Sequence, residues 1–165
     1  MTVIMIDGPE KAGKSTLVEA LHLRGAYVRK WTGPAVPDDS EYFIPLQIDA
    51  KSQRIVVWDR GWASEVVYGQ LLEQPRRLAG DWQRAELLYG RLIEVAVMLL
   101  GPNVETLKRL RDSTDLPIDP SAERRAFAHY GQLAGWIVLE NEHTPTYIAA
   151  LADSLMFMAT SKVTA

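Results

Sequence analysis

The feature that most constrains this chain is the segment from Gly8 to Ser15, which reads Gly-Pro-Glu-Lys-Ala-Gly-Lys-Ser. It is a complete GxxxxGKS motif, preceded by the apolar run 3–6 and followed by a helical pattern. Glycines let such a loop curl so that its backbone N–H groups point at phosphate oxygens, and the start of the next helix adds partial positive charge. The motif predicts a phosphate-binding loop (P-loop) between a strand and a helix, and its context argues against a chance glycine-rich turn.

Individual positions of the loop carry separate predictions. Lys14 is placed to reach the β- and γ-phosphates of ATP, and the Ser15 hydroxyl to ligate Mg²⁺. Pro9 has no N–H, so the cradle must be built from the residues after it. The predicted ATP-binding set is Gly8, Glu10, Lys11, Ala12, Gly13, Lys14, Ser15 and Thr16.

Elsewhere, short apolar runs alternate with helical patterns, which is typical of parallel strands joined by crossover helices. Strands are expected at 3–6, 26–29, 55–58, 95–100 and 136–139. Helices are expected after the P-loop, over 62–73, from about 81, up to 111 and from 145, with at most one short helix in the proline-bearing stretch 31–53. In the last helix, the expected buried stripe is Tyr147, Leu151, Leu155 and Met158. The pattern predicts an α/β fold: a doubly wound, five-stranded parallel sheet with helices on both faces.

Length and composition narrow the functional classes. The 165 residues allow one domain with a proper core and are too few to expect two. A net charge of −3 argues against a broad basic face for polymeric nucleic acid, although it permits a local basic pocket. The chain has no cysteine, which excludes disulfides, thiolate zinc sites and cysteine nucleophiles. No apolar stretch suits a signal peptide or a membrane span, so we expect a cytoplasmic enzyme.

Asp59 and Arg60 follow the apolar run 55–58. Ligands of doubly wound sheets lie at the carboxyl ends of the strands, so both side chains are expected near the phosphates. A carboxylate there can hold Mg²⁺ together with Ser15, and a guanidinium can fork onto a phosphate. A structural salt bridge at a strand end is the alternative interpretation.

The segments IDGPEKAGKST and DRGWASEVVYGQ resemble the thymidylate kinase family of P-loop deoxynucleotide kinases. Ser64 and Tyr68 match the family's pattern, while Gly61 replaces its usual aromatic residue and Trp62 stands in for it. Lys11 is similar to a basic loop residue that helps to stabilise the transferring phosphate in one subclass. The form DRxWxSExVYG is also similar to kinases of bacteriophage nucleotide metabolism, some of which handle modified pyrimidines.

Further along the chain the resemblance is looser. Arg125, Tyr130, Leu133 and Ala134 are similar to the helix after the family's lid, and the family implies a possible homodimer. One departure concerns the segment 31–53, where the family has a long helical segment that closes over the acceptor. We therefore expect a short acceptor-binding insert there, and a smaller or more open acceptor pocket.

A cluster of basic residues brackets the proline-bearing turn at 112–122: Lys108, Arg109, Arg111, Arg124 and Arg125. Small kinases use cations on a mobile lid to cover the phosphates and exclude water. The cluster predicts a lid at about 110–124, with Arg109 and Arg125 as its catalytic cations, whereas a solvated helical face is the alternative for each residue.

The acceptor is the least constrained part of the prediction. The proposed acceptor-binding set is Asp7, Arg29, Arg60, Trp62, Ser64 and Tyr68. Arg29 and Lys30 end the second strand, where cations suit an anionic acceptor, so a (deoxy)nucleoside monophosphate is favoured: thymidylate-like or a modified pyrimidine nucleotide. A nucleoside kinase must instead deprotonate a hydroxyl, and its family typically has a glutamate there. A kinase of modified bases within DNA and a non-catalytic nucleotide-binding module stay open.

Overall fold

The computed structural model describes residues 2–30, 40–73, 82–111, 116–140 and 144–161, with the side chains at 40–42, 82 and 85 outside that description. Its centre is a parallel sheet with strand order β2-β3-β1-β4-β5. The strands are β1 (Thr2–Asp7), β2 (Tyr27–Lys30), β3 (Ile55–Asp59), β4 (Val95–Leu99) and β5 (Ile137–Leu139). The predicted doubly wound α/β fold is confirmed.

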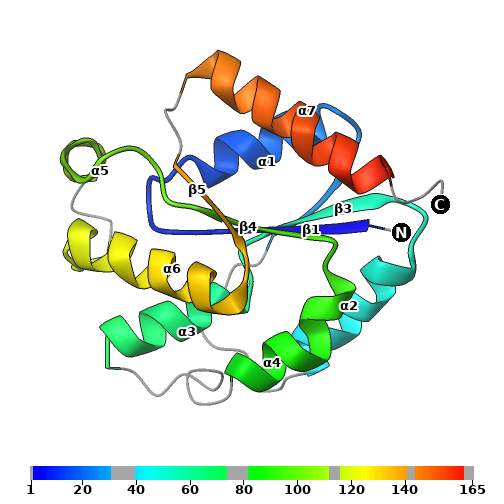
Figure 1. Cartoon of the computed structure of the whole chain (residues 1–165), viewed down its shortest axis with the longest axis horizontal. Helices are drawn as coiled ribbons and strands as arrows, with labels where there is room; N and C mark the ends of the chain where they lie inside the picture. The colour runs from blue at the N-terminus through cyan, green and yellow to red at the C-terminus, as the bar shows by residue number, and fades with distance from the viewer. Residues whose placement is uncertain (1, 31–39, 74–81, 112–115, 141–143, 162–165) are drawn as a thin grey trace.

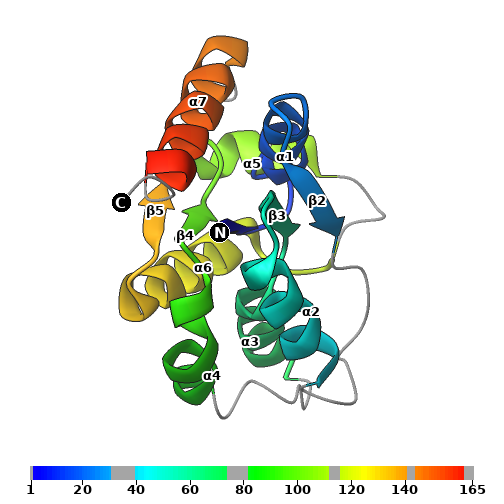
Figure 2. The ribbon, with the colours of Figure 1, turned by 90° about the vertical axis from the view of Figure 1, so that its right-hand side faces the viewer.

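Helices cover both faces of the sheet (Figures 1 and 2). On one face lie α1 (Lys14–His22) and α7 (Pro145–Ser161). On the other lie α2 (Ser40–Lys51), α3 (Trp62–Leu71), α4 (Trp82–Tyr89) with the 3₁₀ turn η1 (Gly90–Leu92), and α6 (Pro120–Ala134). The short helix α5 (Val104–Leu110) lies beyond the carboxyl end of β4. No helix in the described ranges is both long and apolar enough to cross a membrane.

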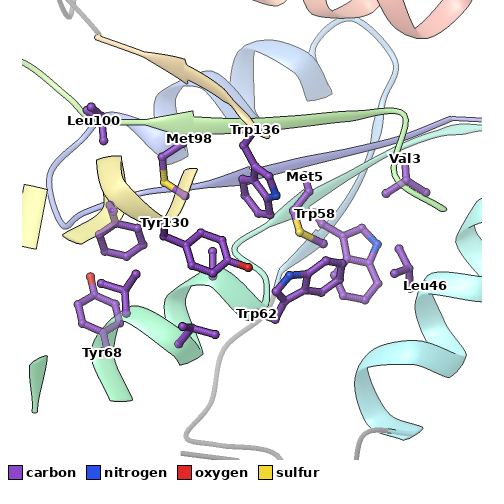
Figure 3. Close-up of a cluster of buried hydrophobic side chains, with 14 of the residues drawn as sticks. Val3, Met5, Leu46, Trp58, Trp62, Tyr68, Met98, Leu100, Tyr130 and Trp136 are labelled. Carbon is purple, nitrogen blue, oxygen red and sulfur yellow. The ribbon is translucent and has the colours of Figure 1, made fainter. Parts of the chain in front are cut away.

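Successive side chains of β1 point to opposite faces of the sheet, and the core is accordingly divided into two halves. Val3 and Met5 point into a large cluster with aromatic residues of α2, α3 and α6, whereas Ile4 and Ile6 point toward α1 and α7. Figure 3 shows the first cluster, where Trp58 and Trp62 lie beneath the strands. Because both faces are covered, β1 and β3 are apolar over 3–6 and 55–58, as their sequences predicted.

Two expectations about helices were wrong in detail. The stretch 31–53 holds a helix of 12 residues, α2, rather than a short one, and Pro45 lies inside it. Burial of Phe43 and Leu46 and the anchoring of Asp49 favour this helix over the cost of the proline. In α7 the buried residues are Ile148, Ala152, Leu155 and Ala159. Of the expected stripe, Leu155 is buried, Tyr147 and Leu151 are partly buried against the same cluster, and Met158 is exposed.

Candidate active site

The P-loop connects the carboxyl end of β1 to the first residue of α1, Lys14. Gly8 has φ 147°, and a Cβ there would lie 2.1 Å from the carbonyl oxygen of Leu99 at the end of β4. A side chain at this position is therefore excluded by the close approach of the neighbouring strand. Gly13, with φ 85°, makes the turn into α1.

The Lys14 ammonium is held inside the curl of the loop. Its Nζ donates to the carbonyl oxygens of Gly8, at 2.8 Å, and Pro9, and the side chain is buried. Burial, and next the positive charge of Arg60, lower the pKa of Lys14 from 10.5 to about 7, against the opposing effect of nearby carboxylates. Lys14 can therefore lose its proton near neutral pH in the free protein, and a bound anion would favour the protonated form.

A pocket of about 560 Å³ opens over this loop. Its lining brings together nearly all of the predicted ATP-binding residues, both predicted magnesium ligands, and the predicted acceptor arginine. The lining residues are Glu10, Lys11, Ala12, Gly13, Lys14, Ser15, Thr16, Asp59, Arg60, Leu110 and Ile148. The P-loop segment 10–16 and the DR segment 59–60 therefore meet in one cavity, as expected for the carboxyl edge of a parallel sheet.

Asp7 connects the P-loop to the DR segment. Its fully buried carboxylate accepts hydrogen bonds from the N–H groups of Gly8, Gly61 and Ser64, at 2.8, 3.1 and 2.9 Å, and from the Ser64 hydroxyl at 2.6 Å. Four donors satisfy the carboxylate. Asp7 and Ser64, both predicted to bind the acceptor, are thus bonded to each other beneath the pocket.

Arg60 lies at the turn from β3 into α3. It adopts a positive φ of 73°, stabilised by the 2.9 Å hydrogen bond from its N–H to the carbonyl of Ile6. Its guanidinium donates to the Ser64 hydroxyl at 3.3 Å and also interacts with the hydroxyl of Tyr68. The turn therefore directs Arg60 over the P-loop pocket, with Tyr68 beside it.

Of the predicted acceptor residues, Arg60 is the one that lines the P-loop pocket, and Arg29 is engaged elsewhere. Arg29 makes a bidentate pair with Asp49 of α2, at 2.5 and 2.8 Å, and lies 5.8 Å from the ring centroid of Trp58. Trp58 donates to the same carboxylate at 2.8 Å. The guanidinium therefore anchors α2 to the sheet rather than facing the P-loop pocket.

Trp62 is fully buried in the aromatic cluster, between Tyr130 and Trp58 in Figure 3, and presents no free stacking face. Its indole N–H donates to Glu86 of α4 at 2.8 Å. Tyr130 and Trp136 donate to the same oxygen at 2.6 and 3.1 Å. Burial and the adjacent Glu86 raise the pKa of Tyr130. In this structure, Trp62 fixes α4 against the core and does not line the pocket.

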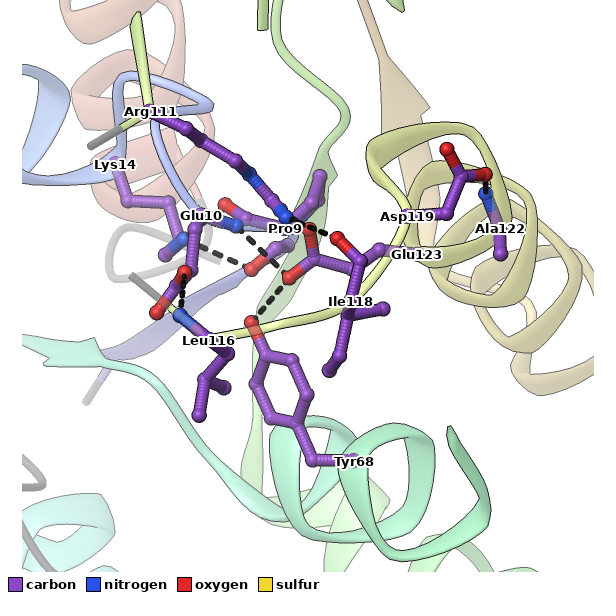
Figure 4. Close-up of polar contacts among 11 residues, drawn as sticks. Pro9, Glu10, Lys14, Tyr68, Arg111, Leu116, Ile118, Asp119, Ala122 and Glu123 are labelled. Atoms are coloured by element: carbon purple, nitrogen blue, oxygen red, sulfur yellow. Dashed lines mark hydrogen bonds and ion pairs between the residues drawn. The ribbon is translucent and has the colours of Figure 1, made fainter. Parts of the chain in front are cut away.

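The cations of the predicted lid differ in their surroundings. Arg109 and Arg125 are exposed and bond within their own helices, to Thr106 at 3.2 Å and to Ser121 at 2.7 Å. Arg111 is 9% exposed and pairs with Glu123 of α6 beside the P-loop (Figure 4). Of the predicted lid range, residues 112–115 lie outside the described residues.

Glu123 is a site residue that the sequence analysis missed. It is fully buried and accepts from the N–H of Glu10 at 3.1 Å and from the Tyr68 hydroxyl at 2.6 Å. A signal was present: Glu123, Phe127 and Tyr130 share one helical face, and a carboxylate in an apolar stripe needs buried partners.

The oxygen donors at the pocket fit Mg²⁺ chemically. Ser15 offers a hydroxyl from the first turn of α1, and Asp59 a carboxylate from the end of β3; both line the pocket. Magnesium in phosphotransfer sites is held by one or two such hard oxygen ligands together with phosphate oxygens.

No protein-family model matches the chain, and no curated protein is similar to it in sequence. Solved structures are similar in fold. The YorR protein of Bacillus subtilis, in complex with phosphorylated GDP, has a TM-score of 0.74 and 19% identity, with 99% of each chain covered.

Two kinases are also similar in fold. The deoxyadenosine kinase of M. mycoides with bound dCTP has a TM-score of 0.61 and 14% identity, covering 94% of this chain and 98% of its own. The thymidylate kinase of Ehrlichia chaffeensis has a TM-score of 0.53 and 13% identity, covering 94% and 96%. At these identities the likeness shows the fold alone. The chain has a P-loop kinase fold.

Proposed function

We propose that this protein transfers the γ-phosphoryl group of ATP to a (deoxy)nucleoside monophosphate, with a thymidylate-like or modified pyrimidine nucleotide as acceptor. One observation carries the proposal: Lys14 of the P-loop and Arg60 of the DR segment line the same pocket. Two cations brought together in this way repel each other, and an anion between them removes the repulsion.

The two cations divide the work of phosphoryl transfer. The backbone of the P-loop and Lys14 hold the β- and γ-phosphates of the donor, and Arg60 holds the acceptor phosphate across the pocket. Ser15 and Asp59 would hold Mg²⁺, which when bound neutralises charge on the phosphate oxygens. Catalysis then consists of alignment and charge neutralisation. An acceptor phosphate is ionised at pH 7, so the chain needs no general base.

The tyrosine and serine beside Arg60 support the acceptor assignment. The Ser64 hydroxyl and the Tyr68 hydroxyl both contact the Arg60 guanidinium and restrict its orientation. A bidentate contact to phosphate needs such a fixed plane. The separation of Arg29 from the pocket removes one argument for an anionic acceptor, so the proposal depends on Arg60.

The test is a coupled ADP-release assay with a panel of deoxynucleoside monophosphates, deoxynucleosides and a DNA oligonucleotide containing a modified pyrimidine. We expect turnover with one or more monophosphates, and loss of turnover in Lys14→Ala with its fold retained. Turnover only with nucleosides, or only with the oligonucleotide, would show that the acceptor belongs to that class and is not a monophosphate. Absence of turnover with the whole panel would reject the kinase proposal in favour of a nucleotide-binding module.

A further inference from the structure

Three elements direct hydrogen-bond donors at one buried carboxylate, that of Glu123 in α6. Its Oε1 accepts from the backbone N–H of Glu10 in the P-loop, at 3.1 Å, and from the Tyr68 hydroxyl of α3, at 2.6 Å. Its Oε2 pairs with Nη2 of Arg111, which follows α5. Figure 4 shows these contacts converging on Glu123 between the P-loop and α6. The carboxylate is fully buried, so its charge depends on these partners.

Glu10 and Arg111 each make a further hydrogen bond, to residues that precede α6. The Glu10 carboxylate accepts from the N–H of Leu116 at 3.1 Å, and Nη1 of Arg111 donates to the carbonyl of Ile118 at 2.7 Å. Leu116 is therefore bonded to the P-loop, and Ile118 is bonded to Arg111, the partner of Glu123. These bonds hold Leu116 and Ile118 beside Glu10 and Arg111 (Figure 4).

Arg111 retains an unused donor in this arrangement. Its side chain is only 9% exposed, and the buried Nε–H has no hydrogen-bond partner among the residues that the structure describes. A buried donor without an acceptor is unfavourable, and an arginine fork is suited to phosphate oxygens. The preceding residue, Leu110, and Glu10 both line the P-loop pocket. The unused donor thus belongs to a cation adjacent in sequence to a residue that lines the pocket. Arg124 also has a buried Nε–H without a partner in the described residues, but neither of its neighbours in sequence lines the pocket.

We infer that Arg111, rather than Arg109 or Arg125, is the lid cation that contacts the transferring phosphate, and that Glu123 is the positioning residue that holds Arg111 and the Glu10 amide in place. The inference rests on the proposed function. Glu123 acts through other groups: it orients the guanidinium of Arg111 and fixes one edge of the P-loop. Through Tyr68, whose hydroxyl also interacts with Arg60, it links the lid to the acceptor side.

The experiment compares steady-state kinetics of the wild type with Glu123→Gln, Arg111→Gln and the double variant. We expect each single variant to lower kcat about 10- to 100-fold with a smaller change in the KM for ATP, because the contact forms chiefly with the transferring group. The loss in the double variant should be smaller than the product of the two single losses, since part of the effect of Glu123 is exerted through Arg111. Losses that multiply, or a wild-type kcat in either single variant, would overturn the inference.

Matched controls separate positioning from folding. Arg124→Gln removes a cation of the same helix that pairs with the exposed Glu140, and its kcat should stay within about twofold of wild type. Arg109→Gln and Arg125→Gln should behave likewise; a large loss in either, with Arg111→Gln unaffected, would reassign the lid cation. Where Glu123→Gln does not fold, Glu123→Asp keeps the charge and shortens the side chain. It should lower kcat, and a wild-type kcat would overturn the role of Glu123.

A binding measurement distinguishes failure of this inference from failure of the proposed function. If the wild type turns over no acceptor, its Kd values for ADP and for a non-hydrolysable ATP analogue are compared with those of the variants. A lid cation at the γ-phosphate predicts that the preference for the ATP analogue over ADP falls about tenfold in Arg111→Gln and Glu123→Gln but not in Arg124→Gln. An unchanged preference rejects the inference, and a wild type that binds neither nucleotide rejects both proposals.

Discussion

The carboxylate of Asp7 accepts a 2.6 Å hydrogen bond from the hydroxyl of Ser64, 57 residues further along the chain. The same carboxylate also accepts N–H groups from the first residue of the P-loop and from the start of α3. The phosphate-binding loop and the segment that carries Arg60 are therefore fastened to one side chain. Their relative position is a property of the folded chain and does not depend on a substrate to assemble it.

This arrangement predicts a graded loss of stability. Asp7→Asn should lower the free energy of unfolding by about 3 kcal/mol, because the amide replaces an acceptor for four donors with a group that itself donates. Ser64→Ala removes only one of those donors and should cost about 1 kcal/mol. Urea denaturation measures both. Ser154→Ala, which removes an exposed hydroxyl bonded to Ala150, is the control and should stay within about 0.5 kcal/mol of wild type. Equal stability of Asp7→Asn and wild type would contradict this account.

Lys14 predicts proton uptake when nucleotide binds. With its pKa lowered to about 7 by burial and by Arg60, Lys14 is largely neutral at pH 8 in the free protein. Phosphate oxygens favour the ammonium, so binding of ADP at pH 8 should take up close to one proton. Calorimetric titrations in two buffers of different ionisation enthalpy should give different heats, and the difference should vanish in Lys14→Ala. Equal heats for the wild type in both buffers would exclude this coupling.

The lowered pKa of Lys14 also predicts the direction in which stability changes with pH. Between pH 7 and 10.5 the unfolded chain binds the Lys14 proton and the folded chain does not, so the contribution of Lys14 to stability rises with pH across this window. Below pH 7 both states hold the proton, and the destabilisation is fully present. Lys14→Met should flatten the dependence of the free energy of unfolding on pH between 7 and 10.5. An unchanged pH dependence in Lys14→Met would show that a group other than Lys14 titrates in this range.

The fold and the P-loop could be predicted because their signals are local. The buried run 55–58 is apolar throughout, and the P-loop motif is contiguous. The buried face of α7 was predicted only in part, because the sequence analysis weighted large side chains and left out Ala152 and Ala159. At Ala159 the helix approaches β1 so closely that Thr2 donates to its carbonyl at 2.7 Å, which favours small residues. Size alone therefore did not identify the packed face.

The side chains around the pocket were harder to predict because their partners are distant in sequence. Arg29 was assigned to the acceptor from its charge and strand position, but Asp49, 20 residues away, pairs with it. Trp62 was assigned from its ring, but Glu86 binds its N–H. Residue type indicated what each group can bond, whereas the pairing depends on how α2 and α4 pack on the sheet.

The segment between α5 and α6 predicts a change in backbone exchange. Amides of residues 110–124 should exchange hydrogen more slowly with an ATP analogue plus acceptor than in the free protein, because substrate phosphates add contacts for the lid. Leu116 is the most informative position, since its N–H is bonded to Glu10 of the P-loop. Hydrogen exchange followed by mass spectrometry measures the change, with the central part of α7 as an internal control. Equal exchange with and without substrates would remove the lid from the mechanism.

Arg60→Lys decides which phosphate this arginine holds. Lysine keeps the charge and has the same aversion to the positive φ at this position, so the substitution chiefly removes the planar fork. If Arg60 grips the acceptor phosphate, kcat/KM for the monophosphate should fall about 10- to 100-fold while the KM for ATP changes much less, because the P-loop binds the donor separately. The same variant assayed with a nucleoside should show little selective loss. A rise confined to the KM for ATP would move Arg60 to the donor side. Wild-type kinetics with both substrates would reduce Asp59 and Arg60 to a structural pair.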